Sequence, residues 1–301
     1  MSGKDKFRTA IGGQALIEGI LMRGPGKTAM VARTPAGIVA EEKEYTPLKE
    51  KNKILGFPLI RGVANFSLSM YDGMKALTWS AEQAVEEEEK ESAGSKLVMA
   101  AGVLLGLALA IGLFTVLPSF IGGLLSPRTG DGVLRNLTET GLRLSVLILY
   151  MLAVSRMKDI RRVFAYHGAE HKTIACYEAG EELTADNVKK YSRFHPRCGT
   201  SFLLMVVLIS LLAFMWVSFN NLFVRVALRL AMLPIVVAAA YEVNRLIGRH
   251  DNALTFVLRA PGLWLQRITT REPDESMIEV GIDALSRVVP PQKGADEWGR
   301  G

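Results

Sequence analysis

The sequence predicts a mainly α-helical, multi-pass membrane protein of about four transmembrane helices, with a small N-terminal β-containing region and a C-terminal amphipathic helix. Two stretches without Asp, Glu, Lys or Arg carry this prediction, residues 97–127 and residues 199–224. A transmembrane helix needs ~20 predominantly apolar residues, and both stretches exceed that length. Mean hydropathy is +0.21 although 22% of the residues are charged, which excludes a purely soluble, a fibrous or a disordered chain.

Four membrane spans are expected in order along the chain, at residues 97–125, 140–155, 199–219 and 222–241. The second span is the weakest, because only residues 144–155 are free of charge and a full-length span must include Arg143. The fourth contains Pro234, which predicts a kink. The alternative is that the second and fourth segments are buried or half-inserted hairpins.

Arginines in these segments need an explanation, because charge inside a bilayer is costly. Arg143 and Arg225 lie close enough to a span end for their side chains to reach the headgroups. Arg229 lies deeper, and it requires either a wet cavity or a partner such as Glu139 or Glu242.

The distribution of positive charge predicts the orientation of the chain. Residues 1–96 carry 14 Lys and Arg, residues 156–198 carry nine and residues 244–301 carry eight, whereas residues 126–135 carry two. Because positive residues collect on the cytosolic side, both termini and the 156–198 loop are expected in the cytosol. The expected location is therefore the inner (plasma) membrane of the cell.

Three regions follow from this organisation: a cytosolic N-terminal region at 1–96, a membrane bundle at 97–243 with the cytosolic 156–198 loop, and a cytosolic tail at 244–301. Within the first region, strand-like patterns at 14–45 predict a small antiparallel sheet, and apolar periodicity from Leu59 to Ala81 predicts a helix. Gly24-Pro-Gly-Lys-Thr resembles a phosphate-binding loop, but Leu21 stands where that motif needs glycine, so a turn is expected.

Two helical segments are expected in the tail. Residues 256–265 are apolar and predict an interfacial segment, with Trp264 at headgroup level. A final soluble helix begins near Pro273, and its apolar face repeats at Ile278, Ile282, Leu285 and Val289.

Histidine and cysteine are concentrated in the 156–198 loop. Three of the four histidines and both cysteines lie within 32 residues. Imidazole and thiolate are the ligands that zinc prefers, and a spacing of four places two ligands on one helical face. We therefore expect a metal site, zinc or another divalent ion, with four candidate ligands: His167, His171, His195 and Cys198. The alternative is that these histidines form hydrogen bonds or bind lipid headgroups.

Residues 167–171 also match the pattern H-x-x-E-H, in which the glutamate is the general base of a metal-dependent hydrolase. Glu170 is thus the candidate catalytic residue. Gly168 weighs against the motif, because glycine is a poor helix former. His250 returns to the same surface after the fourth span, either as a further ligand or as a solvent-exposed side chain.

Four blocks of sequence resemble the bacterial YqhQ-like membrane protein family, a domain of unknown function; they are residues 11–25, 166–173, 191–202 and 260–266. The resemblance covers nearly the whole chain. It implies a multi-pass membrane protein of a family described as predicted metal-dependent enzymes. On the matching positions it points to the residues named above, His167, Glu170, His171, His195 and Cys198.

Two functions remain open from the sequence. The first is a zinc-dependent hydrolase, in which His167, His171 and either His195 or Cys198 bind the ion and leave a position open. The second is a non-enzymatic scaffold, in which all four ligands close a structural zinc and the chain holds a membrane or cytosolic protein partner in membrane-protein biogenesis or envelope maintenance. The net charge of +6 is explained by topology, so the lipid bilayer rather than nucleic acid is the expected partner.

The orientation can be tested by cysteine labelling in intact cells. A cysteine introduced at Thr129 should react with an impermeant reagent added outside, whereas one introduced at Ser2 should not, because positive charge keeps both termini in the cytosol. Reaction at Ser2 would reverse the predicted topology.

Overall fold

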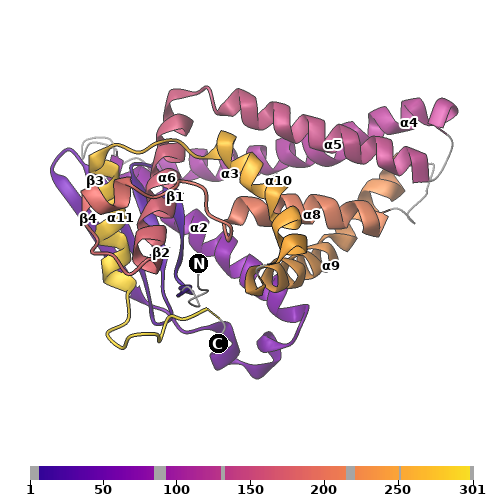
Figure 1. The fold of residues 1–301 in the computed structure, drawn as a ribbon. Coiled ribbons are helices and arrows are strands. Elements are labelled where there is room, and N and C mark those ends of the chain that lie inside the picture. The colour runs from indigo at the N-terminus through magenta and orange to yellow at the C-terminus, as the bar shows by residue number, and fades with distance from the viewer. Residues whose placement is uncertain (1–6, 85–92, 130–132, 215–220, 251, 299–301) are drawn as a thin grey trace.

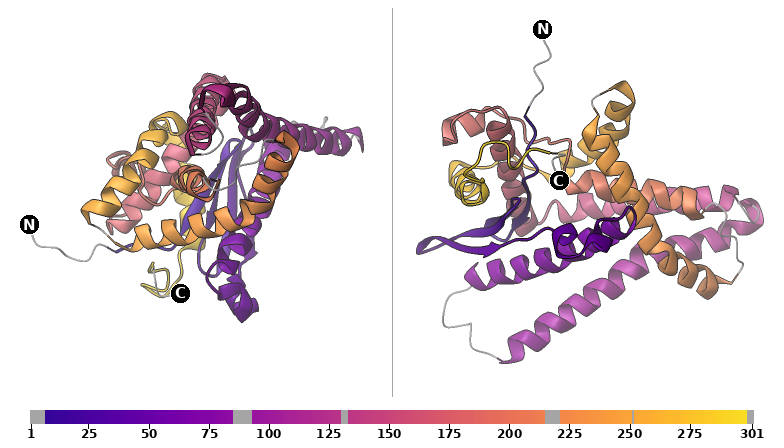
Figure 2. Two further views of the ribbon diagram at one scale, coloured as in Figure 1. Left: turned by 90° about the vertical axis from the view of Figure 1, so that its right-hand side faces the viewer. Right: turned by 90° about the horizontal axis from the view of Figure 1, so that it is seen from below.

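The computed structural model describes residues 7–84, 93–129, 133–214, 221–250 and 252–298. A four-stranded sheet with its covering helices forms one end of the molecule, and a bundle of long helices forms the other (Figure 1). The described ends of the chain, near residues 7 and 298, lie together beside the sheet (Figures 1 and 2). The small N-terminal sheet and the mainly helical class predicted from the sequence are confirmed.

The sheet is an antiparallel meander in which each strand pairs with the next along the chain. Its strands are β1 (Gly12–Leu16), β2 (Gly19–Arg23), β3 (Lys27–Thr34) and β4 (Gly37–Glu44). The turn between β2 and β3 is the Gly24-Pro-Gly sequence, as predicted. β1 is an edge strand, and Gly12 and Gly13 at its start are exposed.

Helices cover both faces of the sheet. After α1 (Leu48–Lys51) and the short η1 (Lys53–Gly56), α2 (Ile60–Ala84) packs on one face through Ala76, which contacts Leu16 and Met30. On the other face, α6 (Lys158–Glu178) and α11 (Glu275–Val288) form the main core, where Tyr166 and Ile278 are fully buried. The predicted final helix is therefore part of the core beneath the sheet rather than a peripheral element.

The bundle contains the membrane candidates. Its helices are α3 (Ala93–Ile111), the π-helical η3 (Gly112–Val116), α4 (Leu117–Thr129), α5 (Val133–Val154), α8 (Gly199–Phe214) and α9 (Leu222–Arg249). Within the described residues, three stretches are long and apolar enough to cross a membrane: Ala101–Leu125, Leu134–Val154 and Leu222–Gly248. The second and fourth predicted spans thus form continuous helices rather than hairpins.

The predicted third span is only partly described. α8 is apolar but has 16 residues, which at 1.5 Å per residue extend ~24 Å, less than the ~30 Å of a hydrocarbon core. Residues 215–219 of the predicted span lie outside the described residues. Three crossing helices are therefore supported where four were expected.

A buried polar cluster joins α4, α5 and α9 inside the bundle. Of the alternatives open for Arg229, the structure shows Glu139 as its partner. Glu139 also lies 3.3 Å from Arg135 and 3.7 Å from Arg225. Arg225 was expected to reach the headgroups, but this expectation was wrong. Its side chain is buried and donates to the backbone carbonyl of Ser119 over 2.7 Å, because that carbonyl and Glu139 offer acceptors within the bundle.

Glu139→Gln should destabilise the bundle. The amide removes the negative charge that faces several buried guanidinium groups, and breaking a buried ion pair from one side costs ~3–5 kcal/mol. Thermal unfolding of the detergent-purified chain measures the effect, with Glu82→Gln on the exposed part of α2 as the matched control. An unchanged midpoint for Glu139→Gln would show that the cluster contributes nothing to stability.

Candidate metal centre

One face of α6 carries the motif predicted from the sequence. His167, Glu170 and His171 lie on successive turns of this helix, and the flanking positions from Ala165 to Cys176 are mostly buried. α6 can approach its neighbours closely because residue 168 is glycine. A side-chain carbon there would overlap the backbone carbonyl of Arg271, which follows α10 (Ala253–Thr269). Close packing against the chain at Arg271 therefore explains why glycine, a poor helix former, occupies position 168 of α6.

Both motif histidines are oriented by backbone carbonyls. The Nδ1 atom of His167 lies 2.9 Å from the carbonyl oxygen of Thr269, and Nδ1 of His171 lies 2.6 Å from that of Arg193. A carbonyl can only accept, so each Nδ1 carries the proton and each Nε2 keeps its lone pair. This is the arrangement by which proteins hold a metal-binding imidazole.

Cys198 completes a group of three potential ligands. Its Sγ atom lies 3.2 Å from Nε2 of His167, and the ligand atoms of His167, His171 and Cys198 all lie within 4.8 Å of one another. The backbone N–H and the hydroxyl of Thr200 approach the sulfur at 3.5 and 3.4 Å, as donors to a thiolate would. The sequence places Cys198 directly before α8, so the start of that helix fixes its position.

The three residues fit a zinc ion. Nε2 of His171 is buried and has no hydrogen-bond partner among the described residues, which is costly unless a ligand satisfies it. Burial is the main reason that the pKa of His171 is lowered, and it favours the neutral, metal-binding form. Two imidazoles and one thiolate are a donor set that zinc accepts.

His195 lies beside this group but not within it. Its ring centre is 5.6 Å from that of His171, and its Nε2 is 3.6 Å from Glu178. Buried Gln266 holds the backbone of His195, accepting from its N–H and donating to its carbonyl, each over 2.8 Å. Burial raises the pKa of Glu178, but the neighbouring His195 and Arg197 side chains outweigh burial, so the pKa is lowered overall.

Glu170 is a buried carboxyl group next to the ligands, with an exposed fraction of 5%. Burial raises its pKa, and the nearby His167 ring and the backbone N–H of Gly13 only partly oppose that effect. A side-chain carbon on Gly13 would lie 3.0 Å from the Glu170 carboxyl carbon and closer still to Leu21. Glycine at the start of β1 therefore allows the strand to pass directly over the motif.

A cavity of about 430 Å³ opens onto the cluster. Its wall combines α6 and the loop before α8 with residues 9–15 and Trp298, from opposite ends of the chain. His167, Glu170, His171, His195 and Cys198 all line it. The sequence did not predict that β1 and Trp298 form part of the cavity wall. For β1 an indication was present, because residues 11–25 are one of the blocks that resemble the YqhQ-like family.

Two other candidates lie away from the cavity. Cys176 is buried, and its Sγ is 3.7 Å from the carbonyl oxygen of Glu182. His250 is exposed, with Nδ1 3.0 Å from the carbonyl oxygen of Leu246. Of the two alternatives for His250, the structure shows the solvent-exposed side chain.

The fold and the cluster together define a protein with membrane-crossing candidate helices and a buried His/Cys site beside a sheet. The family "Protein of unknown function (DUF1385)" matches residues 57–291. The chain is also 32% identical over 303 residues to "Uncharacterized protein YqhQ" of Bacillus subtilis (strain 168), covering 95% of this chain and 94% of the relative. The chain therefore belongs to the YqhQ-like DUF1385 family. No solved structure matches it.

Gly168→Ala should destabilise the site although alanine favours helix. The added methyl group must displace the backbone at Arg271, and with it the Thr269 carbonyl that orients His167. Thermal unfolding and zinc stoichiometry of the purified variant measure this, and both should fall. Gly141→Ala on α5 is the control, because nothing lies within 4 Å of its added carbon. Equal behaviour of the two variants would contradict the packing argument.

Proposed function

We propose that the protein is a zinc-dependent hydrolase held at the cytosolic face of the inner membrane, with both termini in the cytosol. The observation that carries this proposal is the combination of three ligands, His167, His171 and Cys198, with a buried carboxyl group and a cavity. Catalytic zinc sites characteristically have three protein ligands and an open position, whereas structural sites have four.

The ligands and the ion have separate tasks. His167, His171 and Cys198 would hold the metal, with each imidazole oriented through its Nδ1 hydrogen bond. Zinc in such a position supplies Lewis-acid polarisation of the oxygen at the reacting centre. Glu170 and His171 are buried, and electrostatic interactions are stronger at buried positions than in bulk water.

Glu170 would move the proton. Its carboxylate accepts a proton from the attacking water as the new bond to the substrate forms, and it returns that proton to the leaving group as the old bond breaks. A carboxyl group with a raised pKa is suited to both steps, because it is a stronger base than an exposed glutamate. Gly13 keeps the carboxyl group in place from the opposite wall.

A specific observation favours a second function. Nε2 of His195 has no hydrogen-bond partner among the described residues, and the ring lies near that of His171. A rotation away from Glu178 would make His195 a fourth ligand and close the site. The zinc would then be structural, and the protein a membrane scaffold that binds a protein partner in membrane-protein biogenesis or envelope maintenance.

Glu170→Gln separates the two functions. In the hydrolase, metal content and thermal stability should be retained while complementation of a deletion strain is lost, because an amide cannot accept the proton. In the scaffold, complementation should survive. His171→Ala is the companion variant, and it should lower zinc stoichiometry in either case. Full complementation by Glu170→Gln would end the hydrolase proposal.

His195→Ala tests the number of ligands. The three-ligand site should keep close to one zinc per chain, whereas a closed four-ligand site should lose affinity and stability, because a structural ion contributes to folding. Zinc stoichiometry and the unfolding midpoint are compared with those of Cys198→Ala, which should lose metal in both cases. Matching losses in the two variants would favour the scaffold.

A further inference from the structure

The segment between the sheet and α2 exposes an unusual amount of apolar surface. Ile54, Phe57, Leu59 and Ile60 have exposed fractions of 58%, 59%, 51% and 45%. Leu59 also adopts a left-handed backbone conformation, with φ of 69°, which is strained for a non-glycine residue. The chain thus bears a local strain where four neighbouring apolar side chains point outward. We call residues 48–60 the apolar lip.

The lip lies at the end of a candidate membrane span. Gly62 packs directly against Ala238 of α9, and Arg61 donates to Glu242 over 2.6 Å. Ala238 is 16 residues beyond Leu222, or ~24 Å along a helix, within a hydrocarbon layer of ~30 Å. The lip therefore lies near the boundary of that layer, on the side of the sheet and the metal cluster.

A second apolar surface lies at the same end of the bundle. α10 crosses the start of α8, where Gly262 packs on Ser201. Leu254, Phe256 and Trp264 on this helix have exposed fractions of 67%, 65% and 51%. The apolar lip and α10 thus both expose apolar side chains at the end of the bundle that lies next to the sheet, as expected of a surface in contact with lipid.

The charge of the lip indicates which lipids it meets. Lys49, Lys51 and Lys53 are exposed and directly precede the exposed apolar positions, which begin at Ile54, and Glu50 is the only acidic residue of the segment. Apolar side chains combined with lysines are the signature of a segment that binds an anionic membrane surface. A protein partner at this place would have to cover Leu59 and the three lysines at the level of the lipid headgroups. Anionic lipid, which is already present at that level, is therefore the favoured occupant.

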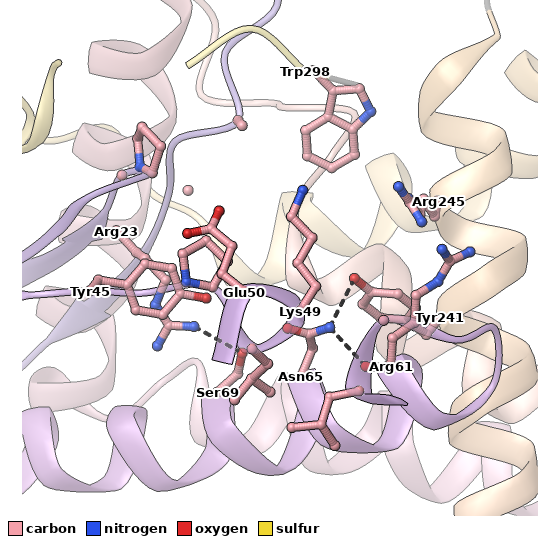
Figure 3. Close-up of a pocket in the computed structure, with 18 of the residues that line it drawn as sticks. Arg23, Tyr45, Lys49, Glu50, Arg61, Asn65, Ser69, Tyr241, Arg245 and Trp298 are labelled. Atoms are coloured by element: carbon pink, nitrogen blue, oxygen red, sulfur yellow. Dashed lines mark hydrogen bonds between the residues drawn. The ribbon is translucent and has the colours of Figure 1, made fainter. Parts of the chain in front are cut away.

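A large pocket opens behind the lip. It has a volume of about 810 Å³, and Lys49 and Leu55 of the lip form part of its wall. Figure 3 shows Lys49 extending toward Trp298, with Tyr241 and Arg245 of α9 on the adjacent side. The pocket and the metal-site cavity share five wall residues, namely Ala10, Gly12, Gly13, Gln14 and Trp298.

We infer that the apolar lip inserts into the headgroup layer and binds anionic lipid, so that the 810 Å³ pocket opens at the membrane surface. The lip contact does not depend on zinc or on hydrolysis. If the proposed hydrolase function also holds, the pocket provides a path from this leaflet toward the metal cluster, and the substrate class is a membrane-resident molecule whose polar end enters it.

The depth of the lip can be measured with the full chain in nanodiscs of phosphatidylcholine, with or without phosphatidylglycerol. A nitroxide at Phe57→Cys should be accessible to oxygen and protected from a water-soluble nickel complex. The control is a label at Ile38→Cys, which is 40% exposed on β4 and should show the reverse. The unsubstituted protein gives the background, because Cys176 and Cys198 are buried.

The lysines provide a second arm of the experiment. Phosphatidylglycerol should place the label at position 57 deeper in the headgroup layer, because its negative charge attracts the lysines. Substitution of Lys49, Lys51 and Lys53 by Gln should abolish this difference between the two lipid compositions. The same substitution at Lys27, Lys43 and Lys190, which are exposed elsewhere, should leave that position unchanged.

Two results would overturn the inference: nickel accessibility at position 57 equal to that at position 38, or protection of position 57 from both reagents, which would indicate a protein cover. The measurement is repeated in His171→Ala. An unchanged depth there supports the lip contact even if the hydrolase proposal fails, whereas a lost contact would contradict its independence of the metal.

Discussion

Two backbone carbonyls, those of Thr269 and Arg193, hold the imidazoles of His167 and His171 in the His/Cys cluster in one orientation. Each carbonyl belongs to a segment that is fixed elsewhere: the first ends α10, and the second precedes the loop that brings Cys198 to the start of α8. The Nε2 lone pairs of His167 and His171 point to one place only because α6 lies close to both of these segments. The absence of a side chain at Gly168 permits that approach. The chemistry of the site is therefore a consequence of helix packing.

Sequence patterns were sufficient for features that depend on one physical property. The charge-free stretch at residues 97–127 predicted the candidate span Ala101–Leu125, because a hydrocarbon core of fixed thickness requires ~20 apolar residues. Alternation and turn chemistry predicted the sheet, and the spacing of His167, Glu170 and His171 placed them on one helical face. The depth of Arg229 in its span indicated a carboxylate partner or a wet cavity, and Glu139, one of two candidate carboxylates, is the partner that the structure shows.

Other features could not be predicted, because they depend on backbone atoms or on choices between equivalent partners. The Thr269 and Arg193 carbonyls have no residue signature. His195 resembled a ligand as closely as Cys198 did, and only the fold turns it toward Glu178. Arg225 could have reached the headgroups, but Glu139 and the Ser119 carbonyl lie within the bundle. Trp298 gave no signal, because its place on the cavity wall depends on contact between the two ends of the chain.

That contact has a consequence for the order of events in the cell. The backbone N–H of Trp298 donates to the carbonyl of Arg8 over 2.7 Å, and Ala10 donates to that of Asp296 over 2.5 Å. The cavity wall is complete only when these two segments have met, and Trp298 is synthesised after the long helices that separate it from Arg8 along the chain. Closure of the cavity around the His/Cys cluster therefore follows synthesis of the helical bundle.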